Sequence, residues 1–493
     1  MPIVLALSPL GVVGVGVLLL MLVEVFSLRH GGLALGTAMV LFAGAAFAGG
    51  VWLFGVDNLP EAASLAPWLL IDRFTLFFDM ILCLGGGLAA LLAGGYLPEH
   101  NLDHPEFYTL LLFASFGAMV LAAAGDALTL FLGLETMSIG AYAMTAFRRS
   151  NPRSAEGALK YFLLGSFAAA ILVYGFALIY GATGHTDLAG IGNAAQTGAA
   201  HNPLLVVGGV LVLVGVLFKV SAVPFHSWTP DAYEGAPTAG TAFMAVAVKA
   251  GAFAMLLRVL VLCFGDPTWE SWASGWPPVM ATLALLTMTV GNLVAGRQES
   301  VKRMLAYSSI AHAGYALLGV TAMMRVPADG AGSVLFYMLA YTASTAGAFG
   351  ALILCGSRGR EAVTYDDLSG LGKRHPAAAL AFSLFLLSLA GIPPTAGFFA
   401  KWFVFRAAID GGLYWLAGLG FVNSVIGAYY YLRVLVYMYM REPAAGAPVA
   451  IPMRSGYVTT ALLVSAILVV VLGLTPAHYL DVALEAAGSF AKG

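Results

Sequence analysis

Long apolar stretches follow one another along the whole chain and are separated by short polar segments. A helix needs about 20 predominantly apolar residues to cross the hydrocarbon core of a bilayer. Stretches of this kind predict fourteen transmembrane helices in the sequence. They lie close to residues 4–27, 33–55, 74–97, 108–124, 127–147, 157–181, 204–223, 238–263, 278–296, 303–323, 332–355, 377–410, 412–439 and 457–474.

The composition agrees with an all-α polytopic membrane protein. Of the 493 residues, 60% are hydrophobic and 10% are charged, whereas an ordinary soluble domain has about 25% charged residues. The net charge of −2 provides no basic field for nucleic acid. The three cysteines lie far apart in apolar stretches, so the sequence predicts neither a disulfide framework nor a metal site. The first apolar stretch is too long for a cleaved signal peptide, and we expect it to remain as a helix.

Lysine and arginine are distributed unevenly between alternate loops. One set of loops holds fourteen of them, whereas the opposite set, with the C-terminal tail, holds Arg73, Arg325 and Lys492. Because cytoplasmic loops are enriched in Lys and Arg, the first set should face the cytoplasm. An even number of helices places both termini on the same side, and the loop charges predict that this is the outer side.

Arginines and tyrosines near the ends of predicted helices are expected to lie at the membrane interface, where long side chains and aromatic rings reach water. The group comprises Arg258, Arg406, Arg433, Tyr429, Tyr430, Tyr431, Tyr437 and Tyr439.

Four ionisable residues, Glu135, Lys219, Lys249 and Lys401, lie in the middle of predicted helices. A charge at the bilayer centre costs between about 2.5 and 17 kcal/mol, so such residues usually face the bundle interior and pair or titrate. The chain has only seven lysines, and three of them are in this group. Lysine suits proton transfer because burial disfavours its charged form and a nearby carboxylate favours it. The alternative is that these charges pair for structural reasons alone.

Two predicted helices are interrupted by proline. Pro224 follows Lys219 by five residues, and Pro393 and Pro394 precede Lys401. Proline removes a backbone donor and breaks or kinks a helix. Two broken helices in corresponding positions of two halves are typical of transporters built from inverted repeats. A weaker internal similarity, between the segments that begin at Ser138 and Ser309, occurs at about the same spacing.

Two histidines are accessory candidates. His312 lies deep in a predicted helix, and His226 follows the break at Pro224. Histidine titrates near neutral pH, so either residue could extend a proton path, although a core histidine with satisfied hydrogen bonds is the default for both. A bis-haem carrier would need pairs of intramembrane histidines, which the sequence does not supply.

The motifs in this order resemble those of the antiporter-like membrane subunits of respiratory NADH:quinone oxidoreductase (complex I), above all the subunit N group. The resemblance rests on LGLETMS at Glu135, RRSNPRSAEGALKYFLLGSF, FKVSAVPFHSWTPDAYEGAPT at Lys219, Lys249, KRMLAYSSIAHAGY, and GIPPTAGFF before Lys401. It spans about residues 72–439. Subunit M remains an alternative, whereas subunit L has a long lateral helix that the short segment after Leu474 does not provide. Ala239 and Gly240 depart from the Pro-Val pair common in the family.

The resemblance implies fourteen helices with two inverted five-helix repeats. The corresponding regions are 1–107 (helices 1–3), 108–263 (helices 4–8), 264–440 (helices 9–13) and 441–493 (last helix and tail). It implies that Glu135 and Lys219 form a modulating ion pair, that Lys249 is the central relay, and that Lys401 exchanges protons with the outer side. Lys160 matches a basic position of the family, although an anchor at the interface is an equal interpretation.

The resemblance also implies a multi-pass protein of the bacterial inner membrane, bound to other membrane subunits of complex I. This chain would hold no redox cofactor and no metal. NADH, FMN, iron–sulfur clusters and quinone would bind to partner subunits. Two alternatives are a subunit of a multi-subunit Na⁺/H⁺ antiporter and a scaffold protein whose buried charges merely pair.

Overall fold

The computed structural model describes residues 2–26, 32–196, 202–273, 275–356, 359–443 and 450–490, so Lys492 lies outside the described residues. The regular elements of this part of the chain are helices. They are α1 (Pro2–Ala6), α2 (Ser8–Phe26), α3 (Leu33–Phe54), α4 (Arg73–Glu99), α5 (Glu106–Ala123), α6 (Ala127–Thr145), α7 (Pro152–Thr183), α8 (Leu188–Gln196), α9 (Pro203–Val220), α10 (Trp228–Gly235), α11 (Thr238–Phe243), α12 (Lys249–Phe264), α13 (Pro277–Ala295), α14 (Val301–Ala322), α15 (Pro327–Cys355), α16 (Leu371–Arg374), α17 (Pro376–Ala390), α18 (Ala396–Asp410), α19 (Tyr414–Met440), α20 (Gly456–Leu474) and α21 (Pro476–Phe490). Short 3₁₀ turns lie at Val56–Asn58, Pro60–Leu65 and Asp366–Leu368, and a π-helical turn at Met244–Val248 joins α11 to α12.

Polar side chains fix where several helices begin. Asp72, Asp126 and Asn151 accept hydrogen bonds from the first free backbone N–H groups of α4, α6 and α7. Asn202 and Ser300 do the same for α9 and α14. These residues satisfy donors that have no partner within the helix, so each apolar stretch begins at a definite residue.

The all-α membrane fold is confirmed. In the described residues, 12 helices are long and apolar enough to cross a membrane, with α11 and α12 forming one span. The two other predicted spans correspond to α14 and to the pair α17 and α18. α14 is long enough to cross but is more polar than the others, because it carries side chains of the site described below. The total of fourteen crossings remains a prediction.

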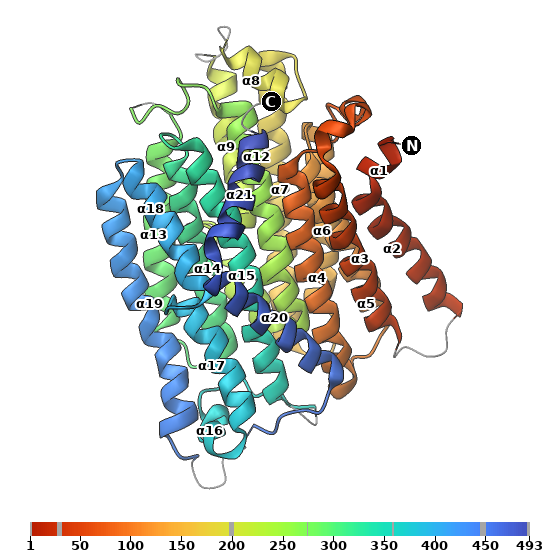
Figure 1. Ribbon diagram of the computed structural model, residues 1–493, viewed down its shortest axis with the longest axis vertical. Coiled ribbons are helices and arrows are strands. Elements are labelled where there is room, and N and C mark those ends of the chain that lie inside the picture. The colour runs from red at the N-terminus through yellow and green to blue at the C-terminus, as the bar shows by residue number, and fades with distance from the viewer. Residues whose placement is uncertain are drawn as a thin grey trace.

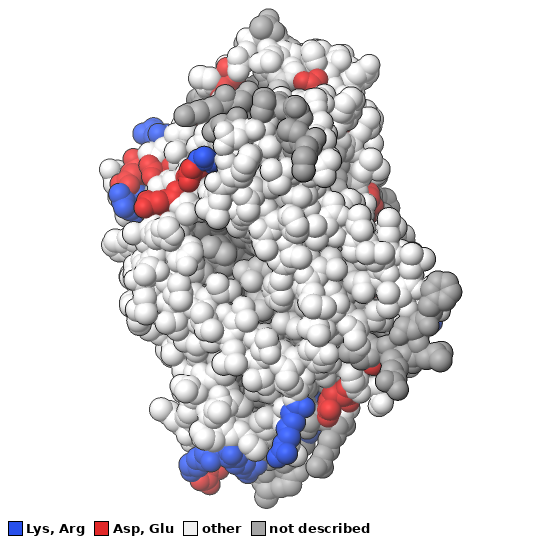
Figure 2. Space-filling model, turned by 45° about the vertical axis from the view of Figure 1, so that its right-hand side comes forward, with Lys and Arg blue, Asp and Glu red and all other residues white. Residues whose placement is uncertain are grey.

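The bundle has a buried centre and lipid-facing edges. α4, the α11–α12 span and α15 are mostly buried, whereas α2, α3 and α19 expose most of their residues. Figure 1 shows α1, α2 and α3 at one edge and α13, α18 and α19 at the opposite edge, with both termini towards one end and α16 at the other. On the face drawn in Figure 2, charged side chains gather towards the two ends and leave a broad uncharged band between them. Such a band fits the hydrocarbon core of a bilayer.

The two interrupted helices end in the same backbone geometry. Ser221 after α9 and Gly391 after α17 both adopt the left-handed conformation, with φ of 68° and 84°. The next N–H in each case, from Ala222 and Ile392, bonds to the carbonyl five residues earlier at 3.0 Å. This is the Schellman motif, which satisfies carbonyls at a helix C-terminus. Pro224 lies between α9 and α10, and Pro393 and Pro394 lie between α17 and α18.

Candidate functional site

Lys219 is held by aromatic rings in the last turn of α9. Its Nζ donates a hydrogen bond to the hydroxyl of Tyr161 on α7 at 3.1 Å. The same Nζ lies 5.1 Å from the ring centre of Tyr142 and 4.9 Å from that of Tyr161, which are cation–π distances. Glu135 on α6 is half-buried and acts on Lys219 through space. Within the described ranges, no cation lies within 4 Å of the Glu135 carboxylate. The Lys219 amine therefore contacts the phenol groups of Tyr142 and Tyr161 and not a carboxylate.

The break after α9 supports this arrangement. Trp228, the first residue of α10, stacks on Tyr161 with ring centres 4.0 Å apart and planes 3° apart. Its indole N–H donates to the carbonyl of Phe218 at 3.1 Å. The break in the helix therefore places the indole ring of Trp228 against Tyr161, which accepts the hydrogen bond from Lys219.

Lys249 is the first residue of α12 and directly follows the π-helical turn at Met244–Val248. Its Nζ donates a 2.6 Å hydrogen bond to the backbone carbonyl of Ser309 on α14 and lies 6.0 Å from the ring centre of Tyr341 on α15. The side chain is 2% exposed. Single π-helical turns within α-helices occur frequently at functional sites, and hydrophobic periodicity gave no sign of this one.

Two neighbours of Lys249, Ser309 and Tyr341, carry buried hydroxyl groups that have no hydrogen bond of ordinary geometry among the described residues. Thr345, one turn after Tyr341 on α15, carries another. Buried polar atoms in proteins are nearly always hydrogen-bonded. These hydroxyls therefore mark a polar compartment inside an apolar bundle, with a capacity to exchange hydrogen bonds with one another and with the lysine.

His312 on α14 connects two tyrosines from different helices. Its Nδ1 lies 2.5 Å from the hydroxyl of Tyr337 on α15, and its Nε2 lies 3.1 Å from that of Tyr431 on α19. The rings of His312 and Tyr341 are 5.1 Å apart, so Tyr341 stands between His312 and Lys249. A cavity of about 10 Å³ beside His312 is of the size that holds one water molecule.

Lys401 on α18 lies against the end of α17. Its Nζ donates to the carbonyl of Ala390, the last residue of α17, at 2.9 Å and to the hydroxyl of Ser424 on α19 at 3.0 Å. That carbonyl is free because the helix is interrupted there, and the C-terminus of a helix attracts positive charge. The Nζ also lies 5.0 Å from the ring centre of Tyr315, whose ring is 5.9 Å from His312. The structure thus brings Lys249, His312 and Lys401 into one row through Tyr341 and Tyr315.

Two accessory candidates lie apart from this row. Lys160 on α7 pairs with Asp231 at 2.7 Å and with Glu156 at 2.6 Å, and its side chain is partly exposed. Asp231 also pairs with Arg303 at 2.8 Å. His226 lies in the segment between α9 and α10, and its buried Nδ1 has no hydrogen-bond partner among the described residues. The hydrogen bond of Lys219 goes to Tyr161 and not to either of these two residues.

Two expectations about interfacial residues are wrong. Arg258 does not extend to water or lipid but is 1% exposed, and its guanidinium binds both carboxylate oxygens of Asp72 at 2.6 and 2.8 Å. Tyr430 and Tyr431 are also buried. Tyr431 bonds to Ser308 and His312, so it belongs to the site rather than to an aromatic belt. Proximity to a predicted helix end did not reveal partners that are distant in sequence.

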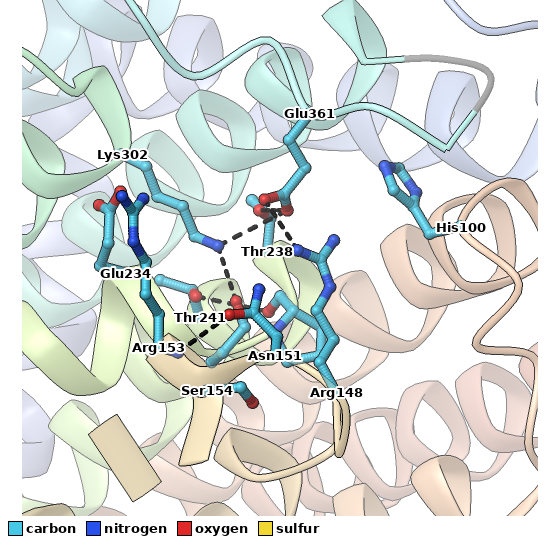
Figure 3. Close-up of polar contacts among 12 residues, drawn as sticks. His100, Arg148, Asn151, Arg153, Ser154, Glu234, Thr238, Thr241, Lys302 and Glu361 are labelled. Atoms are coloured by element: carbon cyan, nitrogen blue, oxygen red, sulfur yellow. Dashed lines mark hydrogen bonds and ion pairs between the residues drawn. The ribbon is translucent and has the colours of Figure 1, made fainter. Parts of the chain in front are cut away.

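A buried charged cluster near the end of the bundle was also missed. Lys302, which the sequence places in a loop, is 1% exposed. Glu361, between α15 and α16, lies 3.6 Å from the Nζ of Lys302 and 3.3 Å from Nη1 of Arg148 (Figure 3). Burial raises the pKa of Glu361, but Lys302 and Arg148 outweigh this effect and hold the pKa at about 2.

Comparison with known sequences places the chain among respiratory membrane subunits. The model of the family "NADH:quinone oxidoreductase/Mrp antiporter, TM" matches residues 124–427. NADH-quinone oxidoreductase subunit N 1 of Sorangium cellulosum is 67% identical over 496 residues, which cover 98% of each chain.

Solved structures agree with the sequence match. A chain of respiratory complex I from Thermus thermophilus with bound aureothin is 34% identical, with a TM-score of 0.77 over 96% of this chain and 98% of that chain. A chain of the Mrp complex from Dietzia sp. is 23% identical, with a TM-score of 0.82 over 99% of this chain and 97% of that chain. The second similarity concerns the fold alone.

Proposed function

Because this chain belongs to the subunit N family of NADH-quinone oxidoreductases, we propose that it moves protons across the membrane through Glu135, Lys219, Lys249 and Lys401. Partner subunits of complex I bind NADH, FMN, the iron–sulfur clusters and quinone, and quinone reduction there drives the protons through this chain. The chain itself carries out no redox chemistry. Its place is the bacterial inner membrane, with both termini on the outer side.

The observation that carries this proposal is the kind of partner that each buried lysine has. Lys219 binds a phenol, Lys249 a backbone carbonyl, and Lys401 a carbonyl and a hydroxyl. A buried lysine without a carboxylate at ion-pair distance is not fixed in its charged form, since an uncompensated buried charge is costly. Neutral acceptors instead accommodate the amine in both protonation states. This chemistry favours proton transfer over the scaffold interpretation.

Glu135 acts as the modulator of Lys219. At an effective dielectric constant of about 20, moving the carboxylate from about 8 Å to about 4 Å from the amine stabilises the charged form by about 2 kcal/mol. That energy changes the proton affinity of Lys219 by about 30-fold. Approach of Glu135 therefore favours the charged form of Lys219, its withdrawal disfavours that form, and the pair in this way modulates the proton affinity of Lys249.

Tyrosines and His312 connect the later steps. From Lys249 a proton passes the hydroxyls of Ser309 and Tyr341 to His312, and then to Lys401 beside Tyr315. The small cavity at His312 supplies a place for one bridging water molecule. Lys401 releases the proton to the outer side. Lys160 and His226 serve as accessory groups at the edges of the path.

Two inverted repeats, 108–263 and 264–440, organise this path, with regions 1–107 and 441–493 packed around them. The support is the identical Schellman geometry of the two interrupted helices, at Ser221 and Gly391. We place the chain in subunit N rather than subunit M, and in a redox-driven complex rather than a Na⁺/H⁺ antiporter. The relative named subunit N, similar over nearly its whole length, supports both choices.

The test measures NADH:quinone turnover and proton uptake together in the assembled complex in closed vesicles. Lys219→Ala and Glu135→Ala are each expected to lower proton uptake strongly. Lys373→Ala is the matched control, because Lys373 is an exposed lysine that pairs with Glu442 outside the path. Full proton uptake in either variant would refute the proposed function.

A further inference from the structure

A polar hollow of about 590 Å³ lies among three connections at the α16 end of the bundle, where α4, α6 and α15 end. It is the end that the loop charges predict to be cytoplasmic. Its walls come from the α4–α5 connection, the α6–α7 connection and the segment after α15. They include His100, His104, Arg148, Asn151 and Gly359. A polar hollow of this size at the end of a membrane bundle admits water.

His100 lines this hollow and has one buried ring nitrogen without a hydrogen bond among the described residues. Its Nδ1 lies 2.9 Å from the carbonyl of Tyr96, and since a carbonyl only accepts, Nδ1 carries the hydrogen. Nε2 is buried and makes no hydrogen bond within the described part of the chain. Burial lowers the pKa of His100, which outweighs the effects of nearby Glu361 and Glu99. The ring is therefore neutral near pH 7 and presents a lone pair at Nε2.

Arg148 stands between the hollow and the charged cluster behind it. It lines the hollow and bonds to Glu361 (Figure 3). It also donates a hydrogen bond to the hydroxyl of Tyr96. Glu361 also accepts 2.5 Å hydrogen bonds from the hydroxyls of Tyr96 and Thr238. Four donors thus converge on one carboxylate, which fixes its position and keeps it ionised.

Lys302 is the innermost member of the cluster and connects it to the relay. Its Nζ donates to the carbonyl of Ala236, just before α11, at 2.6 Å. On α14, Lys302 and Ser309 are seven residues apart, which is two turns or about 10 Å on one helix face. The carbonyl of Ser309 accepts the hydrogen bond from Lys249. Lys302 and the carbonyl that binds Lys249 therefore lie about two turns apart on α14.

We propose that Lys302 is the first proton acceptor of the relay, loaded from the polar hollow, and that Glu361 is a positioning residue that holds Lys302 there. The proposal rests on the proposed function, because it supplies the entrance to the path that leads through Lys249. The substrate of the site is a proton delivered by water. Arg148 separates the hollow from Lys302, so the pair of Arg148 and Glu361 controls the passage.

The substitution Lys302→Arg distinguishes a proton-accepting role of Lys302 from a structural one. Arginine keeps a buried cation but does not release its proton. In vesicles containing the assembled complex, Lys302→Arg is expected to assemble and to lower proton uptake and quinone-linked NADH oxidation at least about tenfold, because loss of a proton-transfer group typically costs 10²-fold or more. Lys373→Arg, at the exposed lysine on α16, is the matched control and is expected to keep both rates. Full rates in Lys302→Arg overturn the proposal.

A second variant tests the entrance even where Lys302→Arg does not assemble. The charged groups near Lys302 are Glu361, Glu234 and Arg148. Glu361→Gln removes one negative charge while keeping the shape, so the amine holds its proton less tightly. The alkaline limb of turnover is expected to move at least about one pH unit lower, and an unchanged profile overturns the proposal.

The variant Lys249→Met distinguishes a failure of the proposed function from a failure of the proposed entrance at Lys302. If Lys249→Met keeps full proton uptake, the proposed function itself fails. If Lys249→Met loses uptake while Lys302→Arg keeps it, only the entrance fails.

Discussion

Gly473 gives the sharpest test of whether the second interrupted helix positions Lys401. Gly473 lies near the end of α20, and a Cβ added there would meet the carbonyl oxygen of Pro394 at 2.0 Å. It would also lie 2.9 Å from the carbonyl carbons of Pro394 and Thr395. Glycine is required here because two backbones approach more closely than any side chain permits.

The size of the disturbance follows from these distances. Real Cβ atoms do not approach other heavy atoms more closely than 3.0 Å, so Gly473→Ala must displace the backbone by at least about 1 Å. Overpacking of this kind typically costs about 1–3 kcal/mol of stability. A misplacement of about 1 Å at a reacting group can cost about 10²-fold in rate. The displaced segment joins Ala390, whose carbonyl binds Lys401, to α18, which carries it.

The assay compares Gly473→Ala with Gly456→Ala in the assembled complex. Gly456 is the first residue of the same helix, and a Cβ there meets nothing within 4 Å. We expect Gly456→Ala to keep normal proton uptake and Gly473→Ala to lose most of it while the complex still assembles. Equal proton uptake in the two variants would show that the break does not position Lys401.

Three further predictions concern other buried contacts. Asp72→Ala leaves Arg258 buried without its carboxylate and should destabilise the protein by about 3 kcal/mol, so an unchanged thermal midpoint in detergent would contradict the pairing. The pKa of Glu361 is lowered to about 2 from an ordinary 4.5. The ionised carboxylate should therefore contribute about 3 kcal/mol to the free energy of unfolding above pH 4.5, and this contribution is lost as the pH falls towards 2. In Glu361→Gln, the free energy of unfolding measured from pH 6 to pH 3 should no longer show this fall. Tyr431→Phe removes one hydrogen bond to His312 and should slow proton uptake about tenfold, the equivalent of one hydrogen bond of about 1.4 kcal/mol, while the amount of assembled complex stays the same; an unchanged rate would remove Tyr431 from the path.

The sequence predicted the helices well because a bilayer imposes a length and a polarity on each of them. It also indicated both interruptions, since proline affects its own helix locally. The α10 and α21 helices were not predicted, because neither is an apolar stretch long enough to cross a membrane. The π-helical turn before Lys249 has no local signal in hydrophobic periodicity.

The sequence predicted the ionisable residues of the candidate site but not the groups that bind them. Lys219, Lys249 and Lys401 stand out because a charge within an apolar stretch is rare. Their partners are hydroxyls and carbonyls from other helices, such as Ser309, which is 60 residues from Lys249. Arg258 was misplaced for the same reason, because Asp72 is 186 residues away. Only the tertiary arrangement distinguishes a buried pair from a side chain at the interface.

The position of each lysine relative to its helix break gives the proposed path a direction. Lys219 belongs to α9, the half-helix before the first break, whereas Lys401 belongs to α18, the half-helix after the second. Figure 1 shows α9 and α18 towards the end that carries both termini, and α17 towards the end that carries α16. Both lysines are thus attached to the halves that face the predicted outer side. The polar hollow and Lys302 lie at the opposite end, so the proposed uptake there and the proposed release beyond Lys401 would use the whole depth of the bundle.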